Sequence, residues 1–225
     1  MIGDILPPEV VAVEAFGDDP RDNALFPEEE AVIAKAVDKR RREFAAARAC
    51  ARAALVQLGF PPAPILPGLR GAPQWPSGVV GSITHCVGYR VSAVARDRDV
   101  RTIGLDAEPH DPLPDGVLGA ITRDGEQAAL AALAVVRPDV CWDRILFCAK
   151  ETVYKAWFPL TRRWLGFEEA TVTIDPVNRT FKARLLVAGP VVDGAALTGF
   201  EGRWLIRGGL ITTAIVVPAK TAPPS

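Results

Sequence analysis

The sequence RTIGLDAE, residues 101–108, guides the interpretation of the fold and the chemistry of this chain. It reads as a β-strand, and the prolines that follow it break the chain. Side chains alternate along a strand, so Asp106 and Glu108 project from one face while Ile103 and Leu105 project from the other. Two carboxylates on one face repel each other unless a cation lies between them, and hard oxygen ligands favour Mg²⁺. The alternative is a pair of solvated carboxylates at the end of a strand.

A second group of polar residues, KETVYK at 150–155, lies on a helix predicted over residues 142–158 and ended by Pro159. The core-facing stripe of this helix comprises Trp142, Leu146, Ala149, Val153 and Trp157. Glu151 and Lys155 are four residues apart and lie together on the opposite side, with Tyr154 beside them. Taken alone, they form an exposed ion pair worth about 0.3–0.5 kcal/mol. Aromatic residues on the same side favour a face that lines a cleft instead.

A third motif, Gly81-Ser82-Ile83-Thr84-His85, ends a strand and leads into a glycine turn. A small residue and a histidine at such a corner can hold a phosphate oxygen, although a lone histidine is more often structural. Cys86 follows His85, but adjacent strand residues point to opposite faces. The two residues are therefore badly placed for an acyltransferase that uses a cysteine nucleophile.

Basic residues follow one edge of a long helix predicted over residues 28–58. Its apolar stripe comprises Ile33, Val37, Phe44, Ala47, Ala51, Leu55 and Leu58. Arg41, Arg48 and Arg52 cluster along the edge of this stripe, and Arg40 falls inside it. A guanidinium in that position either extends to solvent over a packed stem or binds an anion such as a phosphate.

The remaining elements indicate an α+β fold in two subdomains, residues 1–102 and 103–225. Further strands are predicted over residues 79–86, 89–95, 170–174, 181–187, 202–206 and 210–217, and a further helix over 124–136. Gly208-Gly209 is a hairpin signal between the last two strands. The first thirty and the last fifty residues carry no motif.

The composition is that of a globular protein, with 49% hydrophobic and 24% charged residues among 225. A net charge of −1 gives no general attraction to nucleic acid or membranes. The chain shows no secretory leader and no apolar run long enough to span a membrane, so we expect a cytoplasmic protein. Its four cysteines lack CxxC spacing, and Cys50, Cys86 and Cys148 are expected to be buried free thiols.

Together these segments resemble the Sfp-type phosphopantetheinyl transferases, most of all their actinobacterial branch. GAPQWP at 71–76 resembles the family's G-x-P-x-W-P loop, and GSITH at 81–85 its G-S-[IL]-[ST]-H strand. GLDAE at 104–108 resembles its metal strand, and residues 142–155 its W…F-x-x-K-E-x-x-Y-K helix. The motifs have the family's order and spacing.

The resemblance implies two similar α/β halves related by pseudo-two-fold symmetry, with coenzyme A as a substrate in the cleft between them. It implies that Mg²⁺, with Mn²⁺ as the alternative, is bound by Asp106, Glu108 and Glu151. The residues implied to hold the nucleotide phosphates are Arg40, Arg48, Ser82 and His85, and those implied to hold the pyrophosphate are Lys150 and Lys155. Arg70 stands where relatives often carry lysine, and the resemblance implies that either base can reach a phosphate there.

The corresponding hypothesis is a transferase that acts on apo acyl or peptidyl carrier proteins of fatty-acid, polyketide or peptide synthases. A carrier serine attacks the β-phosphorus of coenzyme A and 3′,5′-ADP leaves. Glu151 ligates the ion and accepts the serine proton, directly or through water, while Lys155 stabilises the leaving phosphate. The resemblance favours a monomer. A metal-dependent nucleotide phosphohydrolase and a non-catalytic coenzyme A-binding module are the alternatives.

Overall fold

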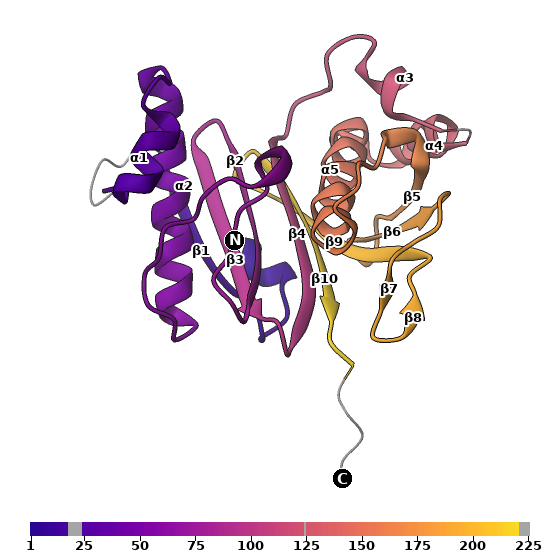
Figure 1. Ribbon diagram of the computed structural model, residues 1–225. Helices are drawn as coiled ribbons and strands as arrows, with labels where there is room; N and C mark the ends of the chain where they lie inside the picture. Colours follow the sequence, from indigo (N-terminus) through magenta and orange to yellow (C-terminus); the bar gives the residue numbers. More distant parts are fainter. Residues whose placement is uncertain (18–23, 124, 221–225) are drawn as a thin grey trace.

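The computed structural model describes residues 1–17, 24–123 and 125–220, and its two α/β halves lie side by side (Figure 1). Each half has an antiparallel sheet with one long helix packed against it. The predicted α+β fold with two subdomains is therefore confirmed.

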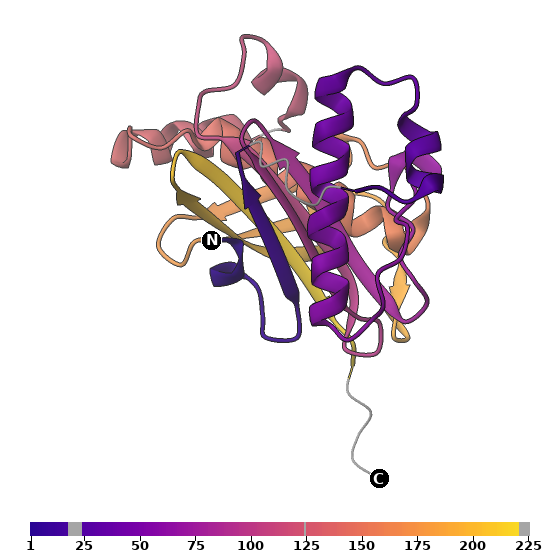
Figure 2. The ribbon, with the colours of Figure 1, turned by 90° about the vertical axis from the view of Figure 1, so that its left-hand side faces the viewer.

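The first half contains a three-stranded sheet in the order β1-β3-β2. In chain order its elements are the 3₁₀ helix η1 (Ile2–Ile5), β1 (Val11–Phe16), α1 (Pro27–Ile33), α2 (Asp38–Gln57), the 3₁₀ helix η2 (Leu69–Gly71), β2 (Val79–Cys86) and β3 (Tyr89–Arg96). Figure 2 shows α2 lying across this sheet. Strand β1 was not predicted from the sequence, although it forms the edge of the sheet.

The second half contains a five-stranded sheet in the order β4-β10-β9-β6-β5. In chain order its elements are β4 (Val100–Pro109), α3 (Val117–Ile121), α4 (Glu126–Val136), α5 (Trp142–Thr161), the 3₁₀ helix η3 (Phe167–Glu169), β5 (Ala170–Asp175), β6 (Thr180–Leu185), β7 (Val191–Val192), β8 (Ala195–Ala196), β9 (Gly199–Arg207) and β10 (Leu210–Pro218). The predicted strands agree with these to within a few residues. The helix expected from 124 begins at Glu126, and Asp124 itself lies outside the described residues.

The two halves share a connectivity, which is what the expected pseudo-two-fold symmetry describes. Each begins with a strand, continues into a long helix, and ends with a strand that pairs with the first: β3 with β1, and β10 with β4. Across the junction, the Leu105 N–H donates to Ser82 Oγ at 3.2 Å and so ties β4 to β2. The predicted division between residues 102 and 103 falls within β4 and stays a prediction.

The helix predicted over residues 28–58 is wrong as a single element, because the chain breaks between α1 and α2. Val37 adopts an extended conformation and is 74% exposed, so it does not belong to the apolar stripe. The Ile33 carbonyl accepts hydrogen bonds from the Ala36 N–H at 2.9 Å and from Arg41 Nη1 at 2.8 Å, in place of the next helical N–H. Arg41 also binds Glu30 at 2.8 Å, which fixes the break.

Helix α5 is longer than predicted, because Pro159 lies inside its last turn and does not end it. A proline there lacks the helical N–H donor and its ring crowds the carbonyl four residues earlier, but only two residues of the helix follow it. The helix ends where Arg162 adopts a left-handed conformation (φ 55°) and its N–H bonds the Phe158 carbonyl at 2.8 Å.

Close packing of α5 on β4 positions the polar face of the strand. A Cβ atom on Gly104 would lie 2.2 Å from the Thr152 carbonyl oxygen, so only glycine permits this approach. One turn further along, Thr102 Oγ1 donates to the Ala156 carbonyl at 2.9 Å. Ile103 and Leu105 are buried in the core on the other side of the strand, so the predicted alternation along β4 is confirmed.

Candidate functional site

Asp106 of β4 and Lys155 of α5 form the centre of the candidate site. Lys155 Nζ donates to Asp106 Oδ1 at 2.7 Å, and Thr84 Oγ1 of β2 donates to the same oxygen at 3.1 Å. The side chain of Asp106 is 6% exposed. Its second oxygen, Oδ2, is buried and has no hydrogen-bond partner among the described residues. An unpaired buried carboxylate oxygen is costly, so a bound cation would stabilise this atom.

Glu108 and Glu151 are the other two acids of the site. Burial raises the pKa of Glu151, and the negative charge of Asp106 raises it further. The same two causes raise the pKa of Glu108, although Arg144 Nη1 donates to its Oε2 at 2.9 Å. The three acids therefore repel one another, and Lys155 and Arg144 offset only part of this repulsion.

These acids are not assembled into a metal site in the described part of the chain. No group of three or more His, Cys, Asp and Glu side chains there could hold an ion. Asp106 pairs with Lys155 instead, and Glu108 pairs with Arg144. The donor chemistry nevertheless fits a hard divalent cation, because the candidate ligands are carboxylate oxygens and Asp106 Oδ2 has no partner.

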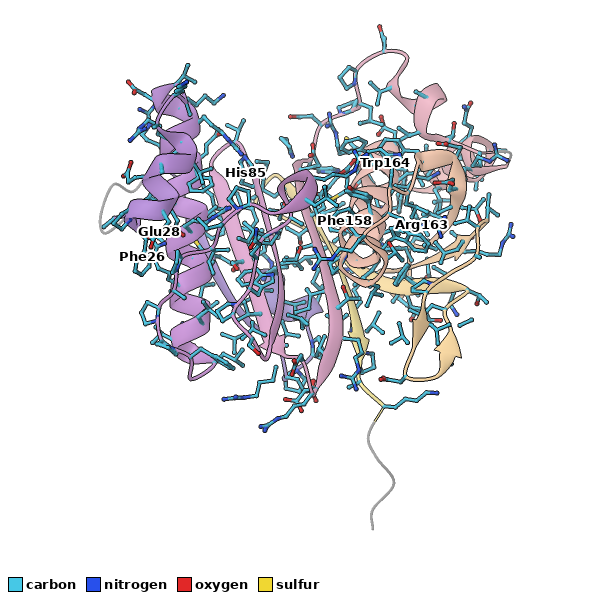
Figure 3. The ribbon with its side chains drawn as sticks, in the orientation of Figure 1. Phe26, Glu28, His85, Phe158, Arg163 and Trp164 are labelled. Atoms are coloured by element: carbon cyan, nitrogen blue, oxygen red, sulfur yellow. The ribbon has the colours of Figure 1, made fainter. Side chains whose placement is uncertain are left out.

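His85 is the second-last residue of β2 and approaches α2, and Figure 3 labels it together with Phe158 and Trp164 of the second half. Arg40 Nη1 lies 3.5 Å from its Nε2, and Glu43 Oε2 lies 3.7 Å away. Burial lowers the pKa of His85, the positive charge of Arg40 lowers it further, and Glu43 opposes the change. His85 is therefore mostly neutral near pH 7. Arg40 is exposed, which matches the alternative in which its guanidinium extends to solvent.

Arg48 is buried on α2 with only part of its guanidinium satisfied. Its Nε donates to the Ile65 carbonyl at 2.8 Å, and the guanidinium carbon lies 4.0 Å from the centre of the Phe44 ring. Burial lowers the pKa of Arg48 to about 10, which leaves it charged at neutral pH. Neither terminal nitrogen has a hydrogen-bond acceptor in the part of the chain that the structure describes.

A cleft of about 650 Å³ runs between the halves, and none of Arg40, Arg48 and His85 is among its lining residues. Its walls come from the loop and strand at 68–83, the start of β4 and the polar face of α5, including Glu151 and Lys155. Arg70 and Tyr154 also line it, and Trp164 stacks against both, with distances of 5.0 Å from the Arg70 guanidinium carbon and 4.8 Å from the Tyr154 ring centre to the Trp164 ring. The cleft is large enough for an elongated organic ligand.

The glycine of the GSITH segment lets the preceding loop pack onto β2. A Cβ atom on Gly81 would lie 2.8 Å from the Trp75 ring, and Trp75 Nε1 donates to the Gly81 carbonyl at 3.0 Å. Ser82 follows Gly81 and lines the cleft, although its Oγ also accepts the bond from Leu105. The GAPQWP loop therefore forms one wall of the cleft.

Lys150 does not join the other predicted site residues. Its ammonium is buried and donates to Glu126 at 2.9 Å and to three backbone carbonyls, those of Ile121 at 2.7 Å, Phe167 at 3.0 Å and Ala170 at 3.1 Å. An ammonium has three N–H donors, so four acceptors satisfy it fully. The predicted contact of Lys150 with a pyrophosphate is therefore incompatible with this arrangement.

Comparison with known families agrees with this geometry. A family model described as the 4′-phosphopantetheinyl transferase N-terminal domain matches residues 28–95, and one described as the 4′-phosphopantetheinyl transferase superfamily matches residues 102–191. The chain belongs to the 4′-phosphopantetheinyl transferases. It is thus an enzyme that transfers 4′-phosphopantetheine, as the resemblance implied.

Similar phosphopantetheinyl transferases come from actinobacteria. The chain is 58% identical to Svp of Streptomyces mobaraensis, over 100% of this chain and 93% of that protein. It is 52% identical to Npt of Nocardia iowensis, over 96% and 99% of the two chains, and 49% identical to PptT of Mycobacterium tuberculosis, over 96% and 98%. The match to the actinobacterial branch of the family is therefore confirmed.

Three further residues of this transferase contribute to the site without having been predicted from the sequence. Thr84 binds Asp106, Arg144 binds Glu108, and Trp164 stacks on Arg70. Thr84 carried a signal, because it lies two residues from Ser82 on the same strand face. Arg144 carried none, because its partner is 36 residues away in the chain.

The cysteines of this transferase do not provide a nucleophile. All four are free, with Cys50 and Cys148 buried as predicted and Cys86 only half-buried. Burial, then Glu108 and Asp106, raise the pKa of Cys86 to about 11, so it is a thiol at neutral pH. The acyltransferase alternative is correspondingly disfavoured. Among the described helices, none combines the length and apolar character that crossing a membrane requires.

Proposed function

We propose that this enzyme takes the phosphopantetheine arm from coenzyme A and attaches it to a serine of an apo carrier protein. The observation that carries the proposal is the buried Asp106 Oδ2, which has no hydrogen-bond partner among the described residues. Its carboxylate pairs with Lys155, which together with Glu151 lines a cleft of about 650 Å³. Such a group of charges suits a reaction that moves a phosphoryl group, where positioning and charge neutralisation dominate.

We assign divalent-metal binding to Asp106, Glu108 and Glu151. Mg²⁺ is the ion we expect and Mn²⁺ the alternative, because both prefer oxygen ligands. When bound, the ion supplies positive charge to the pyrophosphate oxygens and relieves the repulsion among the three acids. Lys155 already neutralises part of this charge through Asp106 and is the residue we assign to the leaving phosphate.

The nucleotide phosphates are assigned to the basic residues near α2. Arg48 supports this because its terminal nitrogens have no acceptors among the described residues, and a guanidinium matches two phosphate oxygens. Arg40 Nη1 and His85 Nε2 lie 3.5 Å apart, so the two side chains together can donate to one phosphate. Arg70 and Ser82, which line the cleft, are the remaining phosphate ligands that we propose.

Glu151 is the general base that we propose. The serine oxygen forms a bond to the β-phosphorus, the bond from that phosphorus to the bridging oxygen breaks, and 3′,5′-ADP leaves with the electron pair. The serine proton passes to Glu151, directly or through water. Burial and Asp106 raise the pKa of Glu151 toward the range in which a carboxylate accepts protons efficiently.

Mass spectrometry of an apo carrier protein incubated with the enzyme, coenzyme A and Mg²⁺ tests the proposal. We expect the carrier to gain one phosphopantetheine group, and we expect Glu151→Gln to lower kcat by about 10²–10⁴-fold. Asp139→Asn, which alters an exposed ion pair, is the matched control and should leave the rate unchanged.

Product analysis separates the alternatives. Release of an adenosine phosphate without carrier protein would identify a phosphohydrolase, and binding of coenzyme A without any product would identify a binding module. A panel of apo carrier domains from fatty-acid, polyketide and peptide synthases would identify the acceptor. The synthase class, the monomeric state and the cytoplasmic location stay predictions.

A further inference from the structure

Arg144 is a counter-ion within the candidate site that the proposed chemistry does not use. Its Nη1 donates to Glu108 Oε2 at 2.9 Å, and the two side chains are 14% and 22% exposed. Arg144 lies in the first turn of α5, where the helix dipole opposes a positive charge. A compensating anion is therefore needed at this position, and Glu108 provides it.

Two further bonds hold Arg144 in place independently of Glu108. Its Nε donates to the Asp111 carbonyl at 2.9 Å, and its Nη2 donates to the Pro112 carbonyl at 2.8 Å. The adjacent Asp143 accepts from the Leu113 N–H at 2.8 Å. The turn that follows β4 is thus fastened to the start of α5, and Arg144 keeps two acceptors if Glu108 moves away.

We propose that Arg144 is a positioning residue that competes with the divalent cation for Glu108, an inference that rests on the proposed function. Without the ion, Arg144 holds Glu108 and Lys155 holds Asp106, which accounts for the lack of a three-ligand group among the described residues. With the ion, Glu108 exchanges Arg144 for the cation. Arg144 is not left without hydrogen-bond acceptors after this exchange, because the Asp111 and Pro112 carbonyls still accept from it.

If Arg144 competes with the ion, its removal should strengthen metal binding, whereas a purely structural role predicts weaker binding. Removing the charge of Arg144 frees Glu108 and removes one positive charge beside the ion, so Arg144→Gln should bind Mn²⁺ with a Kd roughly 3–10-fold lower. If Arg144 only ordered the turn, its loss would leave Glu108 poorly oriented, and metal affinity would fall by about 10–100-fold.

The test titrates the full chain with Mn²⁺ alone, followed by water-proton relaxation, without coenzyme A or carrier protein. Arg144→Lys keeps the positive charge that opposes the ion and should have a Kd closer to that of the wild type than Arg144→Gln has. In a Glu108→Gln background, Arg144→Gln should lower the Kd by less than it does in the wild type, because the two residues act through each other. Arg137→Gln removes a charge from an exposed pair near the start of α5 and should change nothing.

A measurement on the unmutated protein covers the case in which Arg144→Gln does not fold. Titration with Mg²⁺ should shift the side-chain ¹⁵N resonances of Arg144 as Glu108 leaves it. The resonances of Arg52, whose partner Glu29 lies outside the site, should not move.

The outcomes separate this inference from the proposed function. Unchanged or weaker Mn²⁺ binding by Arg144→Gln, or an Arg144 resonance that does not shift, would contradict the competition. The proposed function would still hold if the wild type carried out metal-dependent transfer. A wild type that neither binds Mn²⁺ nor modifies a carrier overturns both.

Discussion

Two buried basic residues, one on each long helix, differ in how completely the protein satisfies them. Lys150 of α5 donates to one carboxylate and three carbonyls, which is all that an ammonium can use. Arg48 of α2 donates through Nε alone and otherwise stacks on Phe44. Burial of a basic residue therefore does not identify a ligand-binding group. The donors that remain without acceptors do.

The same contrast separates two acids. Glu14 of β1 accepts hydrogen bonds from the Ile2 N–H at 2.7 Å, from the Tyr89 hydroxyl and from the Met1 amine. Glu151 accepts none from the described residues, and burial together with Asp106 raises its pKa. The first half thus contains an acid with several hydrogen bonds, Glu14, and an arginine that is only partly hydrogen-bonded, Arg48. The second half contains a fully hydrogen-bonded lysine, Lys150, and an acid that accepts no hydrogen bond from the described residues, Glu151. Glu151 lines the cleft, and Arg48 is the residue that we propose as a phosphate ligand.

Substitution of Lys150 should give the largest loss of stability. In Lys150→Met the Glu126 carboxylate keeps its burial but loses its cation, which costs about 3–5 kcal/mol. Chemical denaturation measures this. Lys182→Met is the matched control, because Lys182 and Glu201 form a pair that is 74% and 77% exposed, and it should cost less than about 1 kcal/mol. Comparable losses in the two variants would show that Lys150 is not a structural residue.

Substitution of Arg48 should affect binding more than stability. Arg48→Met loses one hydrogen bond to a carbonyl, worth about 1 kcal/mol, whereas the loss of charge-assisted bonds to phosphate should raise KM for coenzyme A by roughly 10-fold or more. Steady-state kinetics with an apo carrier protein measure the change.

Arg52→Met provides the control for Arg48. Arg52 lies one turn further along α2, but its guanidinium is tied to Glu29 at 2.8 Å and to the Ala24 carbonyl at 2.6 Å. Its substitution should lower stability and leave KM unchanged. An equal rise of KM in the two variants would mean that satisfied and unsatisfied arginines cannot be told apart in this way.

Regular spacing explains which parts of the site could be predicted from the sequence. Asp106, Glu151 and Lys155 lie on elements whose periodicity is unbroken, so their faces followed from the sequence. The prediction that Lys150 contacts the pyrophosphate was wrong because adjacent helical residues point about 100° apart. Lys150 therefore points into the core while Glu151 lines the cleft. Arg40 lies on α2 four residues before Phe44 and so keeps the phase of the stripe, and its exposure matches the alternative in which the guanidinium extends to solvent. The single helix predicted over residues 28–58 was wrong because the chain breaks between α1 and α2. No local pattern indicates this break, since an arginine side chain from the following helix stabilises it.

The smallest expected effect concerns the satisfied acid, Glu14. Burial alone would raise its pKa, but the hydrogen bonds from Met1, Tyr89 and Ile2 outweigh burial and hold the pKa below the ordinary value of 4.5. A carboxylate with a lowered folded-state pKa contributes stability above its unfolded-state value, and this contribution is lost as the pH falls through the folded-state pKa. The wild type should therefore lose stability below about pH 4.5, and Glu14→Gln should lose less over the same interval.

Urea unfolding at a series of pH values measures how steeply the free energy of unfolding of each protein falls with pH. Glu9→Gln, at an exposed position nearby, should retain the slope of the wild type. If Glu14→Gln retained that slope as well, the three hydrogen bonds would not favour the charged form, and Glu14 would no longer contrast with Glu151.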